Sequence, residues 1–371
     1  MTMRVGFTGG GNITDTHIRA VRDVPGLQAV GVCGPNATKV EALAARYGLR
    51  ASSSLAAMLD QAPLDIVCIG SPSGVHADEI ALAAARGCHV LCDKPLDITL
   101  ERIDTAIAAV DRAGVKLGVF FQDRCTPAFQ AARRDLLDGR LGRVVLVDAR
   151  VKWYRAPEYY ANAKWRGTQA LDGGGALMNQ GIHTVDLLLW LLGDVTDVYA
   201  RAATALHAIE VEDTLTASLS FGSGALGTLQ ATTAAYPGHP RRVEITGTEG
   251  TLVLEHDRVV SWELRSGRVD GATDQSASVS ASTAVVSDAT PHRRVVEDFV
   301  DALQTGRSPA CDAREGRRSV ALAHALYASA RDGAPVAVPT LAAPGRAAAP
   351  RGAGGALSTR GGPFCVENAS S

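Results

Sequence analysis

Residues 4–14 read RVGFTGGGNIT and carry the strongest single indication of the fold. A short β-rich run ends in three glycines, and an amphipathic helix begins directly after them. A glycine turn at such a junction lets the backbone approach a pyrophosphate, whose charge is met by the N–H groups of the helix N-terminus. We therefore predict a dinucleotide-binding turn formed by Gly9, Gly11, Asn12 and Ile13.

The turn departs from the usual fingerprint at one position. The pattern is Gly9-x-Gly11-x-x-Thr14, so the third glycine is missing. Glycine triplets also make ordinary turns, and the motif by itself is a weak indication. Its place at the first strand–helix junction of an alternating chain is what favours dinucleotide binding.

The N-terminal third of the chain alternates between two kinds of segment. The β-rich runs are 4–8, 27–33, 65–69, 89–92 and 116–120. The amphipathic segments between them are 13–22, 37–47, 55–59, 77–86 and 100–113. Near-continuous apolar strands that alternate with helices indicate a parallel sheet covered on both faces. We predict an N-terminal Rossmann dinucleotide-binding domain over residues 1–125.

The pattern changes after residue 142. Further β-rich runs cover 144–152, 215–221, 225–233, 242–246 and 250–254, and helices are expected over 127–138, 177–192, 293–304 and 313–330. Consecutive strands with short glycine turns indicate an open, antiparallel or mixed sheet. The fold class is therefore α/β, with a second α/β domain over 126–340. Residues 266–288 suggest a long hairpin or loose loop, and the Ala/Gly/Pro/Ser-rich segment 341–371 suggests a disordered tail.

The composition excludes several classes of partner. The net charge is −2, which argues against binding nucleic acid or anionic lipid. No apolar run approaches the ~18 residues of a membrane span. The seven cysteines are scattered, without a CxxC pair or zinc-ligand spacing, so reduced thiols in a cytoplasmic protein are the simplest interpretation, and no metal site is expected.

The end of the second predicted strand leaves the choice between NAD and NADP open. An acidic residue usually binds the ribose 2′-hydroxyl at this point, but Gly34 stands there. Asn36 and Lys39 follow closely, and both are candidates for contact with a ribose or a 2′-phosphate. The alternative is that Asn36 only caps the next helix.

Four later motifs turn this general prediction into a family resemblance. They are 71–76 (SPSGVH), 92–95 (CDKP), 165–167 (WRG) and 173–186 (GGGALMNQGIHTVD). Their order and spacing resemble the glucose–fructose oxidoreductase/inositol dehydrogenase (Gfo/Idh/MocA) family from Met3 to Pro339. The resemblance implies a hydride transfer between NAD or NADP and a secondary alcohol or ketone carbon of a sugar, nucleotide sugar or polyol. It also implies a Rossmann domain followed by a domain whose large, mostly antiparallel sheet often forms subunit contacts, hence a homo-oligomer (dimer or tetramer).

Two positions depart from the family pattern. Asp93 matches a usual glutamate, which is a conservative change. Asn179 stands where many members have aspartate, so no mechanism that needs a carboxylate at 179 is available. A subgroup that acts on sugars and nucleotide sugars resembles this sequence in having asparagine there, which makes an inositol dehydrogenase proper the weaker interpretation.

Lys94 is the strongest candidate for the chemistry. Oxidation of a secondary alcohol releases a proton, and the reverse reaction needs a donor to the forming alkoxide. A lysine whose pKa is lowered by burial can perform either step. Lys94 lies at the carboxyl end of a predicted parallel strand, where such sheets bind their ligands, and Pro95 makes a cis bond possible.

The apolar helix expected over 177–192 carries three polar residues on one face. Asn179, His183 and Asp186 are spaced i, i+4 and i+7. A polar substrate cavity would supply the partners that these buried groups need. The alternative is a core histidine whose tautomer is set by Asp186. With the family resemblance we expect His183 to bind substrate or carry a proton, and Asn179 and Asp186 to be substrate ligands.

The remaining candidates come from loops at predicted strand ends. Cofactor contacts are expected from Ser71, Pro72, His76, Asp93, Lys94 and Gln122, and substrate contacts from Arg124, Trp165, Arg166, Tyr154 and Tyr236. His76 has a second interpretation as a helix-start residue, and Trp165 with Arg166 as an ordinary surface loop. Two other functions stay open: a nicotinamide-binding regulator or scaffold without turnover, and a sugar–sugar oxidoreductase that recycles a tightly bound cofactor.

Overall fold

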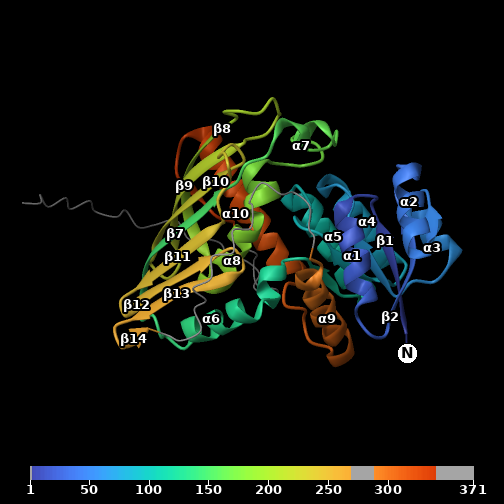
Figure 1. The fold of residues 1–371 in the computed structure, drawn as a ribbon, viewed down its shortest axis with the longest axis horizontal. Helices are drawn as coiled ribbons and strands as arrows, with labels where there is room; N and C mark the ends of the chain where they lie inside the picture. The colour runs from blue at the N-terminus through green and yellow to red at the C-terminus, as the bar shows by residue number, and fades with distance from the viewer. Residues whose placement is uncertain (1, 269–287, 340–371) are drawn as a thin grey trace, which may run out of the picture. The chain divides into compact units, whose positions relative to one another are not determined.

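The computed structural model describes residues 2–268 and 288–339. The predicted tail 341–371 and most of the predicted 266–288 loop lie outside these residues. Within them the chain forms two sheets, with helices between and around them (Figure 1). No helix in these two stretches is both long and apolar enough to cross a membrane.

The first sheet is the predicted parallel one, with the order β3-β2-β1-β4-β5-β6. Its strands are β1 (Met3–Thr8), β2 (Leu27–Cys33), β3 (Arg50–Ser52), β4 (Ile66–Ile69), β5 (His89–Cys92) and β6 (Leu117–Val119). Its helices are α1 (Asn12–Arg22), α2 (Ala37–Tyr47), α3 (Leu55–Gln61), α4 (His76–Ala85) and α5 (Leu100–Ala113), with a 3₁₀ turn at Ser73–Val75. Of these strands only β3 was not predicted, because three edge residues give no readable periodicity.

Each face of this sheet packs into a different hydrophobic cluster. In β4, Ile66 and Cys68 belong to one cluster and Val67 and Ile69 to the other, as the two-residue period of a strand requires. Helices α1 and α2 cover the first face, together with α9 (Thr290–Thr305) from late in the chain, and α3, α4 and α5 cover the second. The sheet is therefore buried on both sides, as the apolar strands predicted.

The second sheet has nine strands in the order β14-β13-β12-β11-β7-β10-β9-β8-β15. They are β7 (Val144–Lys152), β8 (Val195–Ala203), β9 (Thr214–Phe221), β10 (Leu226–Thr232), β11 (Arg242–Gly247), β12 (Gly250–Glu255), β13 (Arg258–Leu264), β14 (Gly267–Arg268) and β15 (Val336–Ala337). All neighbouring pairs are antiparallel except β7 and β10. The α/β fold class with a mostly antiparallel second sheet is thus confirmed.

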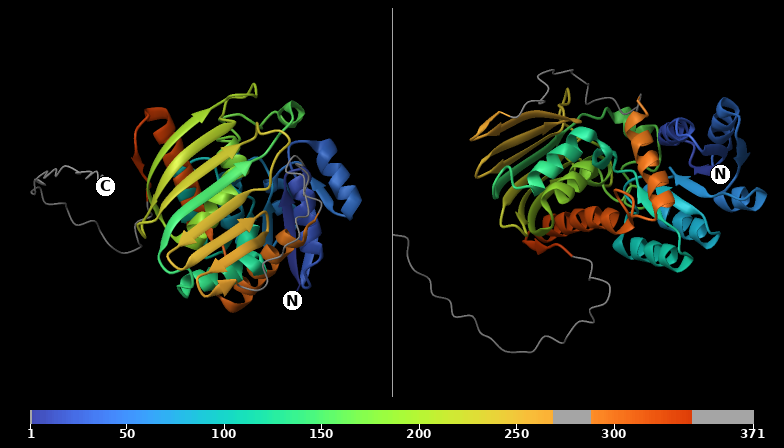
Figure 2. Two further views of the ribbon diagram at one scale, coloured as in Figure 1. Left: turned by 60° about the vertical axis from the view of Figure 1, so that its left-hand side comes forward. Right: turned by 90° about the horizontal axis from the view of Figure 1, so that it is seen from below.

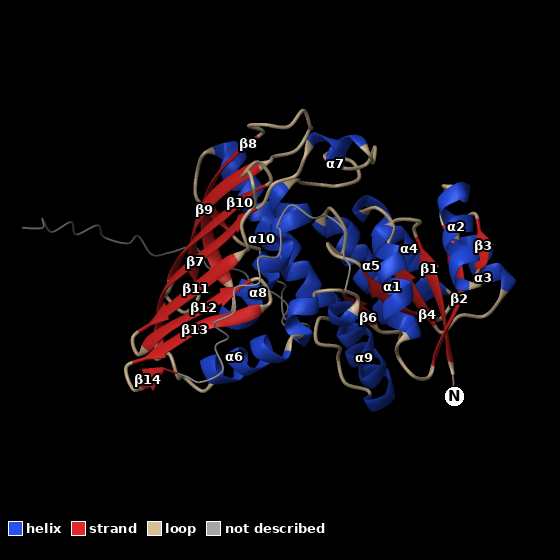
Figure 3. Ribbon diagram, viewed as in Figure 1, coloured by secondary structure: helices blue, strands red, loops and turns tan. Residues whose placement is uncertain are grey.

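Helices cover one face of the nine-stranded sheet. They are α6 (Pro127–Leu137), α8 (Ile182–Leu192) and α10 (Ala313–Asp332), while α7 (Pro157–Ala161) lies in a loop beyond one end of the strands (Figure 3). No described helix lies on the other face, which is turned toward the viewer on the left of Figure 2. Strands β9 and β10 accordingly alternate between buried and more exposed residues.

The helix predicted over 177–192 does not begin as an α-helix. Residues Ala176–Gly181 form a π-helical turn, and α8 starts only at Ile182. Such a turn inserts an extra residue into the helical repeat and is frequent at functional sites. Asn179 therefore lies in the π-helical turn, whereas His183 and Asp186 lie in α8.

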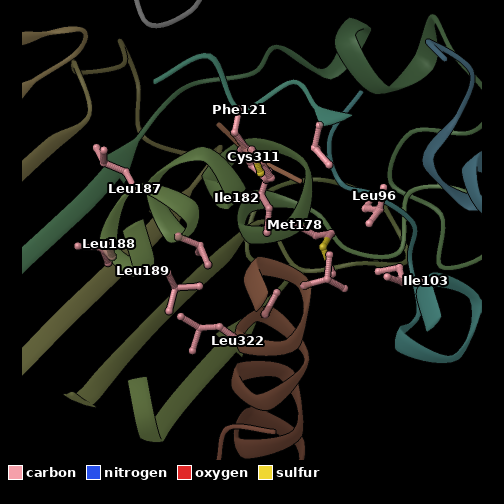
Figure 4. Packing of buried hydrophobic residues seen from close by; sticks show 14 of the residues in the cluster. Leu96, Ile103, Phe121, Met178, Ile182, Leu187, Leu188, Leu189, Cys311 and Leu322 are labelled. Atoms are coloured by element: carbon pink, nitrogen blue, oxygen red, sulfur yellow. The ribbon is translucent and has the colours of Figure 1, made fainter. Parts of the chain in front are cut away.

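One hydrophobic cluster connects the two sheets. Leu96 and Ile103, which follow β5, share it with Met178, Ile182 and Leu322 of the second half (Figure 4). Helix α10 packs against both α5 and α8. This shared core holds the carboxyl end of β5 against the π-helical turn, and it is what brings Lys94 and Asn179 together.

Candidate active site

The glycine turn after β1 has the geometry of a phosphate site. Gly9 has φ +91°, and a Cβ there would lie 2.3 Å from the carbonyl oxygen of Gly70. Gly11 is the N-cap of α1. Among the described residues no side chain caps this helix, and nothing beyond the chain neighbours lies within 4 Å of a Cβ placed on Gly11. Free N–H groups that face open space fit a pyrophosphate, and Asn12 and Ile13 begin the helix that presents them.

Thr14 explains why the third glycine is dispensable. Its side chain is fully buried, and its hydroxyl donates to the carbonyl oxygen of Thr8 at 3.2 Å. A second, longer contact of 3.5 Å reaches the carbonyl oxygen of Gly70. The hydroxyl thus bonds to the strand ends, and α1 still packs closely on the sheet.

The end of β2 has room for a side chain. A Cβ on Gly34 would meet Val40 at 3.4 Å and Gly9 at 3.6 Å, both ordinary contacts. The Asn36 side chain accepts from the Lys39 N–H at 3.1 Å, so it caps α2 as the alternative interpretation stated. Lys39 lies beside the turn, since a Cβ on Gly10 would be 3.0 Å from the Lys39 Cβ. Contact of these residues with a ribose stays a prediction.

Lys94 follows β5 and joins the two halves of the chain. The Lys94–Pro95 bond is cis, and the Lys94 Nζ donates to the backbone oxygen of Asn179 at 2.6 Å. Burial lowers the pKa of Lys94, partly opposed by the charges of Asp93 and Asp172. Burial likewise raises the pKa of Asp93, and the neighbouring Lys94 opposes this. A lysine with a lowered pKa at this sheet edge is suited to accept and return a proton.

His183 and Gln122 each leave a buried polar atom without a partner among the described residues. His183 is half-buried, and its Nδ1 is buried with no hydrogen-bond partner among the described residues. Burial lowers its pKa well below the usual value, and the charge of Lys94 adds to this. The Gln122 Oε1 is similarly buried without a partner in the described part of the chain. Buried polar atoms need hydrogen-bond partners, so both groups fit a site that holds a cofactor and a substrate.

The side chain of Asn179 is directed at a carboxylate that the sequence analysis missed. Its Nδ2 donates to Asp172 Oδ1 at 2.6 Å, and its Oδ1 accepts from Gln180 Nε2 at 2.9 Å. Burial raises the pKa of Asp172 to about 6, against the opposing effect of bonds from Gly167 and Asn179. Asp172 directly precedes the glycines of the 173–186 motif. Its place next to this motif is the feature of the sequence that could have identified it as a site residue.

An aromatic and basic cluster adjoins Asn179. Arg155 Nη2 donates to Gln180 Oε1 at 2.8 Å, and Gln180 Nε2 donates to the Tyr159 hydroxyl at 2.8 Å. The Arg166 guanidinium lies over the Tyr159 ring at 4.2 Å and over the Trp165 ring at 5.5 Å. Substrate contacts were predicted for Arg166 and Trp165 but not for Arg155, Tyr159 or Gln180. The available indication for the first two of these was composition, since residues 153–166 are rich in Trp, Tyr and Arg.

Arg124 and Asp186 have partners other than the predicted substrate. Arg124 Nε and Nη2 donate to the two Asp186 oxygens at 2.8 and 2.7 Å, and Arg124 Nη1 donates to Glu315 at 2.9 Å. The Ser319 hydroxyl also donates to Asp186. Arg124 is 2% exposed and Asp186 0%. Each side chain thus has buried protein partners, so the geometry supports a structural ion pair instead of two substrate ligands.

His76 holds two loops of the cofactor edge together. Its Nδ1 contacts the Pro95 carbonyl oxygen and its Nε2 the Ser71 carbonyl oxygen, both at 2.9 Å. It also begins α4, so the helix-start interpretation and a positioning role coexist. Pro72 precedes the 3₁₀ turn that leads into this helix.

The two predicted sugar-binding tyrosines lie further out. The Tyr154 and Tyr236 rings meet edge to face at 5.2 Å, and Tyr236 is 79% exposed. No contact in the described residues joins either of them to Lys94. Their role as sugar contacts stays a prediction.

Known proteins match both halves of the chain. Residues 3–121 match an oxidoreductase family with an NAD-binding Rossmann fold, and residues 129–253 match the GFO/IDH/MocA C-terminal domain. D-xylose 1-dehydrogenase (NADP(+)) 2 of Haloferax volcanii is 30% identical over 312 residues, covering 83% of this chain and 91% of that protein. Inositol 2-dehydrogenase of Rhizobium meliloti is 29% identical over 336 residues, covering 89% and 97%.

A solved structure is similar over nearly the same length. The WlbA dehydrogenase from Bordetella pertussis, in complex with NADH and UDP-GlcNAcA, is 34% identical with a TM-score of 0.82. The match covers 91% of this chain and 99% of that one. The resemblance seen in the sequence motifs is thereby confirmed, and the chain belongs to the GFO/IDH/MocA family of NAD-binding oxidoreductases.

Proposed function

We propose that this protein is an NAD(P)-dependent dehydrogenase that acts on a secondary alcohol of a sugar or nucleotide sugar. One observation carries the proposal: a half-buried lysine with a lowered pKa lies at the carboxyl edge of the Rossmann sheet, and its Nζ donates at 2.6 Å to the second half of the chain. The glycine turn opens at this same edge of the sheet, since β1 and β5 are parallel strands on either side of β4.

Each of these residues has a separate role in the proposed reaction. When bound, the nicotinamide would supply the hydride acceptor for oxidation of the alcohol carbon and the hydride donor for reduction of the ketone. Neutral Lys94 takes the hydroxyl proton as the hydride leaves, and the resulting ammonium returns that proton in the reverse direction. His183, which burial keeps neutral, orients the substrate oxygen through a ring nitrogen. The turn Gly9–Ile13, the loop after β4 and Gln122 hold the cofactor.

Two arginines adjoin the site and could bind an anionic group of a sugar. The charge of Arg155 acts on Lys94, as do the opposing charges of Asp93 and Asp172, and the charge of Arg166 acts on Arg155. A relative that is 34% identical has been solved with UDP-GlcNAcA, a nucleotide-linked sugar acid. We therefore extend the proposal to sugars that carry a carboxylate or a nucleotide, and UDP-GlcNAcA is the first compound to test.

The test is a substrate panel that measures nicotinamide absorbance with NAD and with NADP. UDP-GlcNAcA, neutral sugars and polyols are compared, and Lys94→Met is the control for background. Turnover without added dinucleotide would indicate a sugar–sugar oxidoreductase with a retained cofactor. Cofactor binding without any sugar-dependent change in absorbance would refute the dehydrogenase and favour a regulator.

The proposal includes a homo-oligomer in the cytoplasm. Leu146 and Leu226 lie opposite each other in β7 and β10 and are 52% and 61% exposed, on the sheet face that no described helix covers. The family resemblance associates this sheet with subunit contacts, and the exposed leucine pair supports the same face as the interface. Light scattering of the purified protein tests the assembly: a monomer at micromolar concentration would contradict it. Cell fractionation tests the location.

A further inference from the structure

Four side chains form one hydrogen-bonded row through the candidate site. Asn179 donates to Asp172 at 2.6 Å, Gln180 donates to Asn179 at 2.9 Å, and Arg155 donates to Gln180 at 2.8 Å. Asp172 also accepts the Gly167 N–H at 2.8 Å. Asp172, Gln180 and Arg155 are buried, with exposed fractions of 2%, 9% and 6%. Water therefore has little access to replace a lost partner.

The two ends of this row determine the direction of the two amides between them. At a pH well above its pKa of about 6, Asp172 is a carboxylate and only accepts hydrogen bonds. A guanidinium only donates them, whereas an amide can be turned to do either. With Asp172 at one end, the facing group of Asn179 must be its NH₂. With Arg155 at the other, the facing group of Gln180 must be its oxygen. Every bond in the row then runs from Arg155 toward Asp172.

We propose that Asp172 and Arg155 are positioning residues that hold Asn179 and Gln180 in this one orientation. The backbone of residue 179 carries the oxygen that receives the Lys94 Nζ, so the same row also holds the proposed proton-transfer group. This inference rests on the proposed function for its catalytic consequence. Residue 179 is itself an amide, and Asp172 supplies a carboxylate that is one hydrogen bond away from it.

A single substitution that keeps the side-chain size should leave one pair of facing groups that cannot hydrogen-bond, whichever way the amides of the row are turned. In Asp172→Asn, the new NH₂ faces another donor, either the Gly167 N–H or the Asn179 Nδ2. If Asn179 and Gln180 both turn, the Gln180 NH₂ faces the Arg155 guanidinium, so two donors then meet there. In Gln180→Glu, the added oxygen faces Asn179 Oδ1, and turning Asn179 makes its oxygen face Asp172. Each single change therefore leaves a buried polar group unpaired.

The double variant Asp172→Asn/Gln180→Glu should remove the mismatch. Gly167 N–H then donates to the oxygen of the new amide at position 172, and the NH₂ of that amide donates to the turned Asn179 oxygen. The Asn179 NH₂ donates to the new carboxylate at position 180, which still accepts from Arg155. The Tyr159 hydroxyl turns to donate to this carboxylate as well. The net charge and the side-chain sizes equal those of the wild type, so only the direction of the row has changed.

The decisive measurement is the melting temperature of the apoprotein, which needs no substrate. Each single variant is expected to melt about 2–8 °C below the wild type, the usual effect of one or two unpaired buried groups. The double variant should return to within about 2 °C of the wild type. Asp172→Asn/Gln28→Glu is the matched control, because it has the same composition with the new carboxylate outside the row, and it should show no recovery. Gln28 is exposed in β2.

The second measurement is kcat with UDP-GlcNAcA and NAD. Asp172→Asn should lower kcat at least about tenfold, because a misplaced catalytic group reacts slowly, and the double variant should regain most of that loss. Additive melting losses in the double variant would overturn the inference, as would wild-type stability of both single variants. If Asp172→Asn does not fold, folding of the double variant supports the inference and its failure overturns it. A wild type inactive on every sugar would refute the proposed function alone, since the melting comparison still decides the direction of the row.

Discussion

Asp186→Asn removes one negative charge from the interior and leaves the size of the side chain unchanged. Its carboxylate receives two bonds from Arg124 and one from the Ser319 hydroxyl. Both charged partners are almost fully inaccessible to water. Loss of one member of a buried ion pair usually costs about 3–5 kcal/mol, because the other charge stays buried without compensation.

The structure indicates the lower end of that range. Arg124 keeps two partners, the Glu315 carboxylate at 2.9 Å and the Ala310 carbonyl oxygen at 3.2 Å. Glu315 is about one-third exposed, so it neutralises the guanidinium only in part. The asparagine can still accept one bond, but its NH₂ then faces a guanidinium N–H. We expect the free energy of unfolding to fall by about 3 kcal/mol.

Urea unfolding followed by tryptophan fluorescence measures this change. Asp60→Asn is the matched control, since Asp60 pairs with Arg86 at the surface with 65% exposure, and it should cost less than about 1 kcal/mol. The double variant Arg124→Met/Asp186→Leu should recover most of the loss, because it removes both charges and fills the space. A substitution that raises KM without changing kcat has removed a contact that binds substrate. Because we assign no such contact to Asp186, KM for the sugar in Asp186→Asn should stay within about twofold of the wild type. A loss below about 1 kcal/mol together with a raised KM would show that Asp186 is a substrate ligand after all.

Lys94→Met is expected to lower kcat by about 10²–10⁴, the usual contribution of a positioned acid–base group, with cofactor affinity much less affected. Stopped-flow turnover and cofactor titration check this, and a near-normal kcat would reject the mechanism. In the wild type, kcat/KM for alcohol oxidation should rise with pH and level off below the ordinary lysine pKa of about 10.4, because burial lowers the pKa of Lys94 and only its neutral form accepts a proton. If the same rise persists in Lys94→Met, another group is responsible for the titration. Gly34→Asp should shift the ratio of kcat/KM values toward NAD, since the site has space for the side chain and a carboxylate there accepts from the 2′-hydroxyl and repels a 2′-phosphate; an unchanged ratio would refute this.

Local patterns were sufficient for five of the six strands of the first sheet and for the glycine turn after β1. Apolar runs such as 66–69 are short and bounded by turn residues, and their burial follows from composition alone. Gly9 and Lys94 could also be identified, because each lies next to a strand end that periodicity makes visible. The family motifs added His183 and Asn179 by their spacing. None of these predictions required knowledge of which distant residues meet.

Long-range contacts decided the roles within the site. The i, i+4, i+7 spacing identified three polar residues on one helix, but it could not identify their partners. Asp186 pairs with Arg124, 62 positions away in the chain, and Asn179 bonds to Asp172. Arg155 is 25 positions from Gln180 and carries no motif of its own. Periodicity and motifs report a residue's neighbours along the chain, whereas burial and charge pairing depend on neighbours in space, so only the folded structure could assign these partners.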